Sequence, residues 1–492
     1  MPTSPTVPRS FTPSILSGVP GIVVWRSVVA AAQGVGLVCG LVGIGACEST
    51  VELDIRLVMP EESDSLERTH HVSVVVQPQG LVRSFDVQGI DFDAPVAVIP
   101  SDQLSTVTTY LARDTTLLGW GSTVPFPTLP LMEDVAAFIG LPGRLSTFPT
   151  ALSTPDPQML ASYAPARGIV MLHSDGATFL MNHYTYDVDR AASLSPPPQA
   201  DDGGLFPAAD GAVMRVAWKN GLAAWRFDPG EDMWAPVDLP AGSVLGPRGG
   251  AVVLPDGHQR LLFFGGGGAL DAFSLDLVPT ADGVLAVSWL EGSKLASTRT
   301  GATAVWIDHG ADQLRDVVLF GGSDAAAPLV ALWGGAPVAG DMRSAWTGAA
   351  CASVGALPEA SATSRVVCVG GVRDGEATAD GVLIEHTLGA AQTCRFELLP
   401  DLLPRSIPEP LAFPFPAESL LYVQGEGALV RVETVELTTY LQDAGAERGG
   451  GGQAVRLPTG ATFLLAGTAA DGSPASRIQV LVPPLDGAAG TH

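Results

Sequence analysis

The five cysteines are the residues of this chain whose chemistry is most readily inferred from the sequence. Cys39 and Cys47 lie near the N-terminus, and Cys351, Cys368 and Cys394 lie in the C-terminal half. A thiol can accept an acyl group, pair with a second thiol or bind a metal ion. The spacings match no zinc site, and no nearby histidine supports one. We therefore expect acylation or disulfide chemistry, and neither a metal nor a cofactor.

Cys47 follows a segment with the features of a secretory signal. Arg26 precedes an apolar run from Val28 to Gly45, and polar residues follow Cys47 directly. The sequence Ile44-Gly45-Ala46-Cys47 resembles the lipobox of bacterial lipoproteins. The resemblance implies that residues 1–46 are a signal peptide and that Cys47 is the lipidation site. It also implies a bacterial cell-envelope protein, anchored by lipid at the outer membrane or cell surface.

The apolar run also permits two other interpretations. It is near the length that spans a bilayer, so it could remain as an uncleaved anchor. It could also be a plain signal peptide that is cleaved without lipidation.

An exported chain permits a disulfide among the remaining cysteines. We expect Cys351 and Cys368 to lie on adjacent strands of one sheet, which makes them the candidate pair and leaves Cys394 as an odd thiol. Burial of all three as small apolar residues is the alternative.

A repeated strand pattern determines the predicted fold. Short apolar strands end in glycine at Gly266, Gly322, Gly371, Gly425 and Gly467, so these glycines are 56, 49, 54 and 42 residues apart. Two further apolar strands upstream, at 169–173 and 213–218, continue the same step. A period near 50 indicates an array of similar supersecondary units. We predict seven four-stranded units in an all-β chain, which is a seven-bladed β-propeller over residues 144–485.

The repeat resembles the kelch and galactose oxidase type of propeller. That type has a diglycine after the second strand and an aromatic residue in the fourth, and we expect the glycine to relieve crowding and the aromatic ring to fill the wedge between blades. The expected fourth-strand aromatic residues are Trp234, Trp289, Trp346, Phe396 and Tyr440.

The two ends of the repeat region predict how the ring closes. The seventh unit lacks a fourth strand, and the segment Leu145–Leu152 precedes the first unit without a partner. We predict that this segment joins the last blade. Residues 486–492 are expected to form a disordered tail.

Residues 47–143 do not show the repeat. Seven short strands are predicted at 51–59, 72–77, 83–89, 96–100, 108–112, 117–121 and 135–141. Alternating apolar and polar residues are clearest at 51–57, as in a strand with one buried face. The pattern predicts a small β-sandwich of immunoglobulin or transthyretin type.

Other candidate sites have a simpler structural explanation. Copper in galactose oxidase-like propellers needs Tyr and His ligands, and the densest such group, His183-Tyr184-Thr185-Tyr186, is expected to alternate across a strand as blade packing. His70 and His71 beside an acidic stretch are read as a solvated loop. The loops at Asp374-Gly375-Glu376 and Asp471-Gly472 are read as turns, with calcium as the alternative. The glycine runs 265–268 and 449–452 lack the Lys-Ser/Thr of a phosphate loop.

The charge balance narrows the range of partners. The formal net charge is −25 at pH 7, and removing residues 1–46 leaves 24 basic and 51 acidic residues. Such a chain repels phosphate backbones, so we expect no nucleic acid partner.

Together these features predict a non-enzymatic binding scaffold for a protein or glycan partner. The alternatives are an exported glycan-active enzyme (hydrolase, lyase or oxidase) with its site in the channel, and a purely structural envelope protein. Fold alone does not separate them.

Overall fold

The computed structural model describes most of the chain after residue 50. The described residues are 22–23, 51–53, 55–61, 63–86, 96–98, 103–127, 135–191, 203–240, 246–290, 294–295, 297–308, 315–333, 338–339, 342–357, 360–387, 393–415, 419–425, 427–442, 448–469 and 471–485. Cys47 and the predicted tail at 486–492 lie outside them.

From β11 onward the chain forms successive, mainly antiparallel sheets. Three of these sheets each have four consecutive strands. The first consists of β12(Leu160–Ala164), β13(Gly168–Leu172), β14(Thr178–Asn182) and β15(Val188–Arg190), and the second of β16(Gly203–Pro207), β17(Val213–Ala217), β18(Ala223–Asp228) and β19(Met233–Val237). The third consists of β20(Val252–Asp256), β21(Arg260–Phe264), β22(Ala272–Asp276) and β23(Val287–Trp289).

The later sheets vary this plan. They comprise β24(Thr303–Asp308), β25(Arg315–Phe320) and β26(Val330–Trp333); β29(Ala350–Leu357), β30(Ala360–Val369), β33(Gly381–Thr387) and β34(Thr393–Leu399) with β27(Val338–Ala339) beside β34; β35(Leu411–Phe415), β36(Leu420–Gly425), β37(Ala428–Glu433) and β38(Thr438–Gln442). Smaller pairings join β28(Trp346–Thr347), β31(Val372–Arg373) and β32(Glu376–Ala377), and β39(Arg448–Gly450) with β42(Thr468–Ala469).

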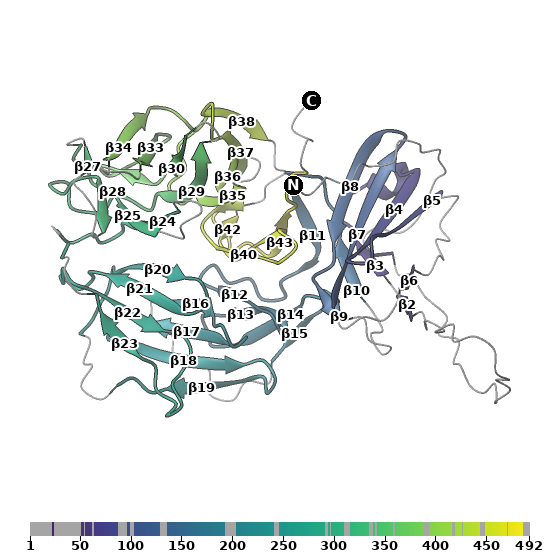
Figure 1. The fold of residues 1–492 in the computed structure, drawn as a ribbon, viewed down its shortest axis with the longest axis horizontal. Helices are drawn as coiled ribbons and strands as arrows, with labels where there is room; N and C mark the ends of the chain where they lie inside the picture. Colours follow the sequence, from purple (N-terminus) through teal and green to yellow (C-terminus); the bar gives the residue numbers. More distant parts are fainter. Residues whose placement is uncertain are drawn as a thin grey trace.

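The last sheet combines strands from both ends of this region. β40(Gln453–Arg456), β41(Thr462–Leu465) and β43(Arg477–Leu481) are completed by β11(Leu145–Ala151), which pairs antiparallel with β43 from Leu145↔Leu481 to Ala151↔Arg477. The predicted closure by residues 145–152 is therefore confirmed. The sheets lie around a common centre, so the fold is a β-propeller (Figure 1).

The second strand of each sheet explains the apolar runs in the sequence. All five residues of β13 and of β17 are buried, and so are the last four of β21. Neighbouring sheets cover both faces of these strands, so their side chains are apolar on both sides instead of alternating. The first strands of neighbouring sheets, such as β12 beside β16 and β40, lie innermost.

The N-terminal unit encloses a core of its own between two groups of strands. One sheet has the order β5(Leu81–Asp86), β4(His71–Gln77), β7(Leu104–Arg113) and β8(Thr116–Ser122), with β9(Phe126–Pro127) on β7. The others are β1(Ile22–Val23), β3(Ile55–Val58) and β10(Val135–Phe138), and the pair β2(Val51–Leu53) and β6(Val96–Val98). The only helix among the described residues is α1(Ser65–Arg68). The strands lie close to their predicted positions, and β1 falls inside the predicted signal peptide.

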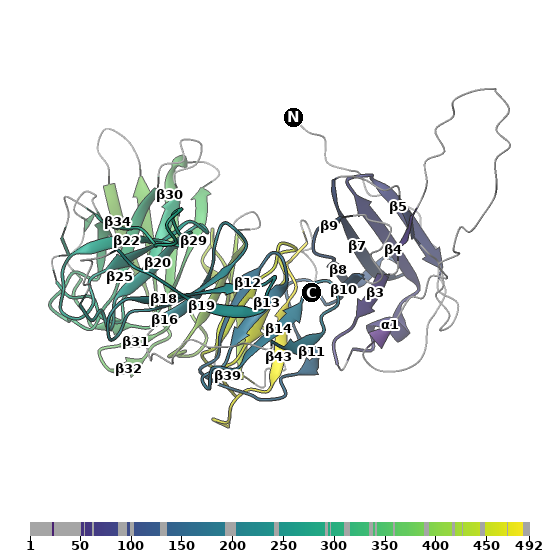
Figure 2. The same ribbon diagram turned by 90° about the horizontal axis from the view of Figure 1, so that it is seen from below.

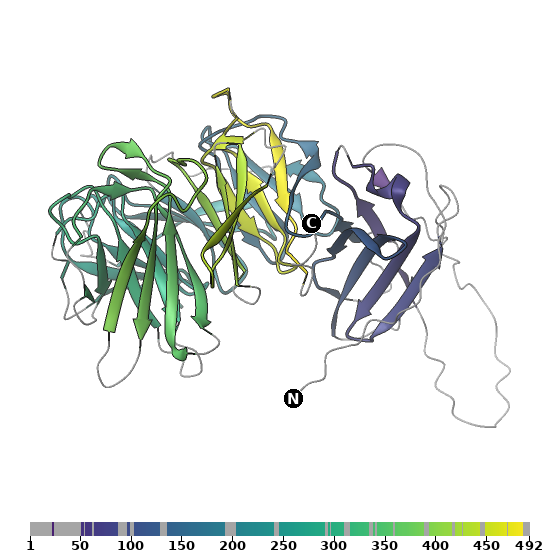
Figure 3. The same cartoon turned by 90° about the horizontal axis from the view of Figure 1, so that it is seen from above.

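The N-terminal unit packs against the sheet that closes the ring. Figures 2 and 3 show it to one side of the propeller, next to β11 and β43. Val58 and Phe138 share a buried core with Phe148 and Val482. The Trp120 indole donates a hydrogen bond to the Pro483 carbonyl at 3.3 Å. The two units therefore share one continuous apolar interface.

Candidate functional site

A large hollow in the described residues lies where several first strands end. Its volume is about 800 Å³. The walls come from β12, β16, β20 and β40 and from the β7–β9 region of the N-terminal unit. The lining residues are Leu104, Val124, Pro125, Ala161, Ser162, Tyr163, Pro165, Tyr184, Leu205, Phe206, Pro207, Pro255, His258, Gln453, Ala454, Val455, Arg456, Leu457 and Pro458. We call this hollow the channel-mouth pocket.

Proline recurs at the ends of the first strands around this pocket. Pro207 and Pro255 lie within β16 and β20, and Pro165 and Pro458 follow β12 and β40 closely. Each of these is an edge strand of its sheet among the described residues. Proline has no N–H to donate to a ladder, so an edge strand tolerates it where a central strand does not. This proline pattern is visible in the sequence, and it marks the pocket that the glycine repeat did not reveal.

A half-buried tyrosine, Tyr163, and a buried histidine, His183, support one wall of the pocket. The Tyr163 hydroxyl lies 2.9 Å from Nδ1 of His183, whose side chain is 2% exposed. Burial lowers the pKa of His183 to about 4 and raises that of Tyr163 to about 12, with a smaller contribution from Tyr184. Both groups are therefore neutral near pH 7, and a single hydrogen bond joins the hydroxyl to the imidazole.

The expected alternation of residues 183–186 along a strand is wrong. β14 ends at Asn182, and the residues that follow form a turn. The Asn182 side-chain oxygen accepts a hydrogen bond from the Tyr184 N–H at 2.8 Å, which favours a turn over a continued strand. As a result Tyr184 reaches the channel-mouth pocket while Tyr186 is buried in the core.

The charged and polar groups of the lining are few. Arg456 and His258 are its basic residues, and the described lining contains no carboxylate. Ser162, Gln453 and the hydroxyls of Tyr163 and Tyr184 add neutral polar groups. Arg456 donates to the Pro414 carbonyl at 3.2 Å and lies 4.9 Å from the Phe415 ring centroid. Leu104 stands at the edge, 59% exposed.

The diglycines have a function in packing that differs from the expected one. The Gly265, Gly321 and Gly370 carbonyls accept hydrogen bonds from Arg248 at 3.3 Å, Arg299 at 2.9 Å and the Trp346 indole at 2.7 Å respectively. All three donors precede the first strand of a sheet, in the patterns Arg248-Gly249-Gly250-Ala251, Arg299-Thr300-Gly301-Ala302 and Trp346-Thr347-Gly348-Ala349.

Glycine is required there by backbone conformation and by the close approach of this loop. Gly265 and Gly266 have φ of 65° and 86°, in the left-handed region. A Cβ on Gly266 would lie 2.5 Å from the Arg248 carbonyl oxygen. The loop before the sheet thus leaves no room for a side chain at Gly266. Glycine relieves crowding here against this loop.

The fourth-strand aromatic residues are only partly as expected. Trp234 lies in β19 and is 3% exposed, but Trp289 in β23 is 52% exposed and Tyr440 in β38 is 48% exposed. These two rings lie on outer edge strands and do not fill a wedge. Trp346 is not in a fourth strand at all, because it forms β28 in the loop before β29. Phe396 lies in β34, as expected.

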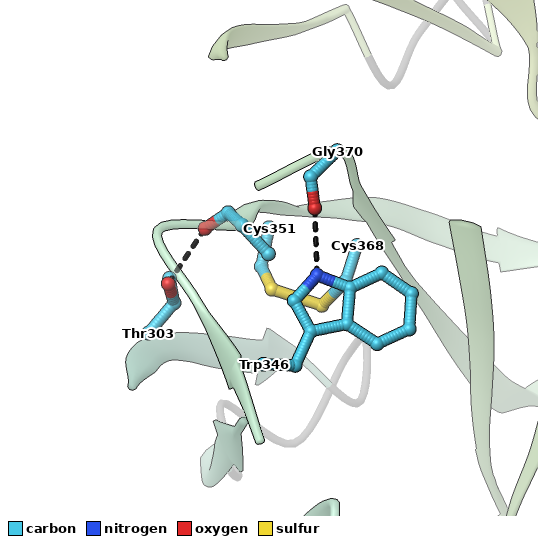
Figure 4. The surroundings of a disulfide bond; sticks show 6 residues. Thr303, Trp346, Cys351, Cys368 and Gly370 are labelled. Atoms are coloured by element: carbon cyan, nitrogen blue, oxygen red, sulfur yellow. Dashed lines mark hydrogen bonds between the residues drawn. A yellow bond between two sulfur atoms is a disulfide. The ribbon is translucent and has the colours of Figure 1, made fainter. Parts of the chain in front are cut away.

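The thiols of Cys351 and Cys368 form a disulfide in the structure. Their strands, β29 and β30, are antiparallel neighbours, and the two residues are directly opposite each other. The Trp346 indole lies beside the bridge (Figure 4). Cys394 is a buried free thiol, and burial raises its pKa to about 11.

The remaining sequence candidates do not come together in the described residues. The expected solvated loop is wrong for His71, which begins β4 and is 3% exposed. Its Nδ1 lies 3.1 Å from a carboxylate oxygen of Asp86, and Nδ1 of His70 lies 3.6 Å from one of Asp114. In the described part of the chain, no group of three or more His, Cys, Asp or Glu residues could hold a metal ion. Among those residues, no helix has the length and apolar character needed to cross a membrane.

Comparisons with known proteins give structural likeness only. No protein-family model and no curated protein matches the chain. The structure of YjhT is similar over 59% of this chain and 94% of that one, with a TM-score of 0.32 and 14% identity. The structure of Sqt1 of Saccharomyces cerevisiae is similar over 68% of this chain and 87% of that one, with a TM-score of 0.40 and 11% identity. The β-propeller domain of Cps50 (Swd1) of Myceliophteria thermophila is similar over 68% of this chain and 98% of that one, with a TM-score of 0.40 and 10% identity. The assignment of this chain as a propeller is based on its own sheets.

Proposed function

We propose that the chain is an exported, lipid-anchored cell-envelope protein whose propeller is a non-enzymatic binding scaffold for a protein or glycan partner. In this proposal Cys47 carries the lipid and the propeller has seven blades of kelch-like type, preceded by a small β-sandwich. The channel-mouth pocket is the binding site.

The observation that carries the proposal is the composition of that pocket. Its walls combine three aromatic rings with five prolines, and they are set on the ends of strands from four sheets. Binding sites of this kind are concave and mainly apolar, with a few polar groups that fix orientation. Loops and strand ends on a rigid scaffold are suited to recognition.

The glycan-active enzyme is the less favoured alternative. Hydrolysis of a glycosidic bond ordinarily needs a pair of carboxylates beside the substrate. The described lining contains none, and Tyr163 in the lining and His183 behind it are both neutral near pH 7. A purely structural envelope protein would have no need of an open pocket with convergent polar groups.

Site-directed photo-crosslinking on intact cells tests the proposal. A diazirine amino acid placed at Leu104, on the rim of the pocket, should yield a covalent adduct with a protein or glycan. The matched control is Leu441 on β38, which is 58% exposed against 59% for Leu104. An adduct of equal yield at both positions, or none at Leu104, would contradict a binding site at the channel mouth.

A further inference from the structure

We infer that the channel-mouth pocket takes a short extended segment of a protein partner that carries apolar side chains and a carboxylate. This inference rests on the binding function proposed above and names the class of ligand.

The walls favour an apolar ligand. The rings of Tyr163, Tyr184 and Phe206 stand among prolines and aliphatic residues, and apolar atoms make up most of the lining. A pocket of about 800 Å³ lies at the upper end of the range of roughly 300–1,000 Å³ found for small-ligand sites. It therefore admits a few residues of a chain, not a folded domain.

The strand ends favour a polypeptide over a glycan. β12, β16, β20 and β40 are each the edge strand of their sheet among the described residues, so one row of backbone groups in each has no partner strand in its own sheet. An extended peptide can use such backbone groups for hydrogen bonds. At Pro207 and Pro255 only the carbonyl is available, because proline has no N–H. A glycan presents hydroxyls on most of its carbons and needs many polar side chains, and the lining provides few.

The charge of the lining favours a carboxylate on the ligand. Arg456, which is held in place by the Pro414 carbonyl and the Phe415 ring, gives the lining its positive charge. The described lining offers no opposing carboxylate, although the chain as a whole has a net charge of −25. An acidic ligand is therefore repelled by the surface in general and attracted at this site.

An array of random heptapeptides, each present with a free and an amidated carboxyl end, tests the inference on the chain from residue 47 onward. We expect the retained peptides to be rich in apolar and aromatic residues and to contain Asp, Glu or a free carboxyl end. Leu104→Glu and Arg456→Glu should each weaken binding about tenfold or more, because they place negative charge at the pocket. Leu441→Glu adds the same charge on an outer strand and should leave binding unchanged.

Three results would overturn the inference. Retained peptides that are basic, or pocket variants with unchanged melting temperature that bind like the wild type, would contradict it directly. Binding to a glycan array that Leu104→Glu abolishes, with no peptide bound, would replace the peptide with a glycan while leaving the proposed function intact. If neither a peptide nor a glycan binds and no adduct forms at position 104 in cells, both this inference and the proposed function are contradicted.

Discussion

At the residue scale, the tyrosine–histidine pair shows how this pocket differs from a catalytic one. Tyr163 and His183 lie at hydrogen-bonding distance, as in many proton-transfer sites. Burial moves their pKa values apart, to about 12 and about 4, so neither is poised to exchange a proton near pH 7. The pair is better suited to holding the pocket wall in place.

The low pKa of His183 predicts that acid weakens the fold. Between its unfolded value of about 6.5 and its folded value of about 4, the unfolded chain binds more protons than the folded one, so stability falls as pH falls through this window. We expect this loss to be smaller in His183→Gln. Urea unfolding of the wild type and of His183→Gln from pH 7 to pH 4 measures the free energy of unfolding of each. Parallel plots of this free energy against pH would refute the assignment of the loss to His183.

The indole of Trp346 is expected to stabilise the loop before β29. Trp346→Phe keeps an aromatic ring but removes the donor to the Gly370 carbonyl, leaving a buried acceptor unsatisfied at a cost of about 1–3 kcal/mol. Chemical denaturation measures this change. Trp289→Phe, on a half-exposed ring, is the control and should cost little; equal effects would show that the hydrogen bond contributes nothing.

At the element scale, β11 joins the two ends of the propeller. Its Phe148 is 2% exposed and contacts the rings of Phe138 in β10, Phe463 in β41 and Tyr186 in the segment between β14 and β15. Closing the last sheet with an early strand makes the ring depend on contacts between distant parts of the chain.

Phe148→Ala should therefore destabilise the whole propeller. We expect a loss of about 3–5 kcal/mol, the usual cost of removing a buried phenylalanine. Thr150→Ala, an exposed position on the same strand, is the control. A single cooperative unfolding transition shifted to lower denaturant would agree with this role, whereas a change no larger than that of the control would not.

The sequence predicted elements better than it predicted the site. Apolar runs at a regular spacing located the second strands, because burial on both faces leaves a continuous signal at β13, β17 and β21. A glycine pair follows β21, whereas β13 and β17 were located by the spacing alone. The missing fourth strand of the last sheet predicted the role of β11. The predicted fourth-strand position was wrong for Trp346, because spacing alone does not distinguish the last strand of one sheet from the loop that precedes the next sheet.

The pocket could not be predicted because its residues come from segments far apart in the sequence. Leu104, Tyr163, Phe206 and Arg456 belong to four different sheets, and no local motif connects them. The recurring proline at first-strand ends was the available signal. The sequence predicts a strand at Tyr184, whereas the turn made by Asn182 brings this residue to the pocket.

At the scale of the whole molecule, the N-terminal unit braces the closing sheet. Their shared apolar core, the Trp120–Pro483 hydrogen bond and the ion pair of Arg477 with Glu61 at 2.7 Å connect them. In the proposed function, this unit also connects the propeller to the membrane anchor.

The lipid anchor predicts a clear effect of one substitution. Palmitate labelling in a bacterial host should mark the wild type, and Cys47→Ser should abolish the label and release the protein from the membrane fraction, since acyl chains contribute about 0.8 kcal/mol per buried methylene. Cys39→Ser should keep the label. Label that survives Cys47→Ser would contradict lipidation at this cysteine.

The central claim is that the channel mouth is a non-enzymatic binding site. Hydrogen–deuterium exchange tests it most directly, on the chain from residue 47 onward and with the partner recovered by crosslinking at position 104. A binding scaffold predicts slower exchange at 161–165, 205–207 and 453–458, which line the pocket, and a partner of unchanged mass. Protection confined to outer strands such as β38, or cleavage or oxidation of the partner, would contradict a non-enzymatic binding site at the channel mouth.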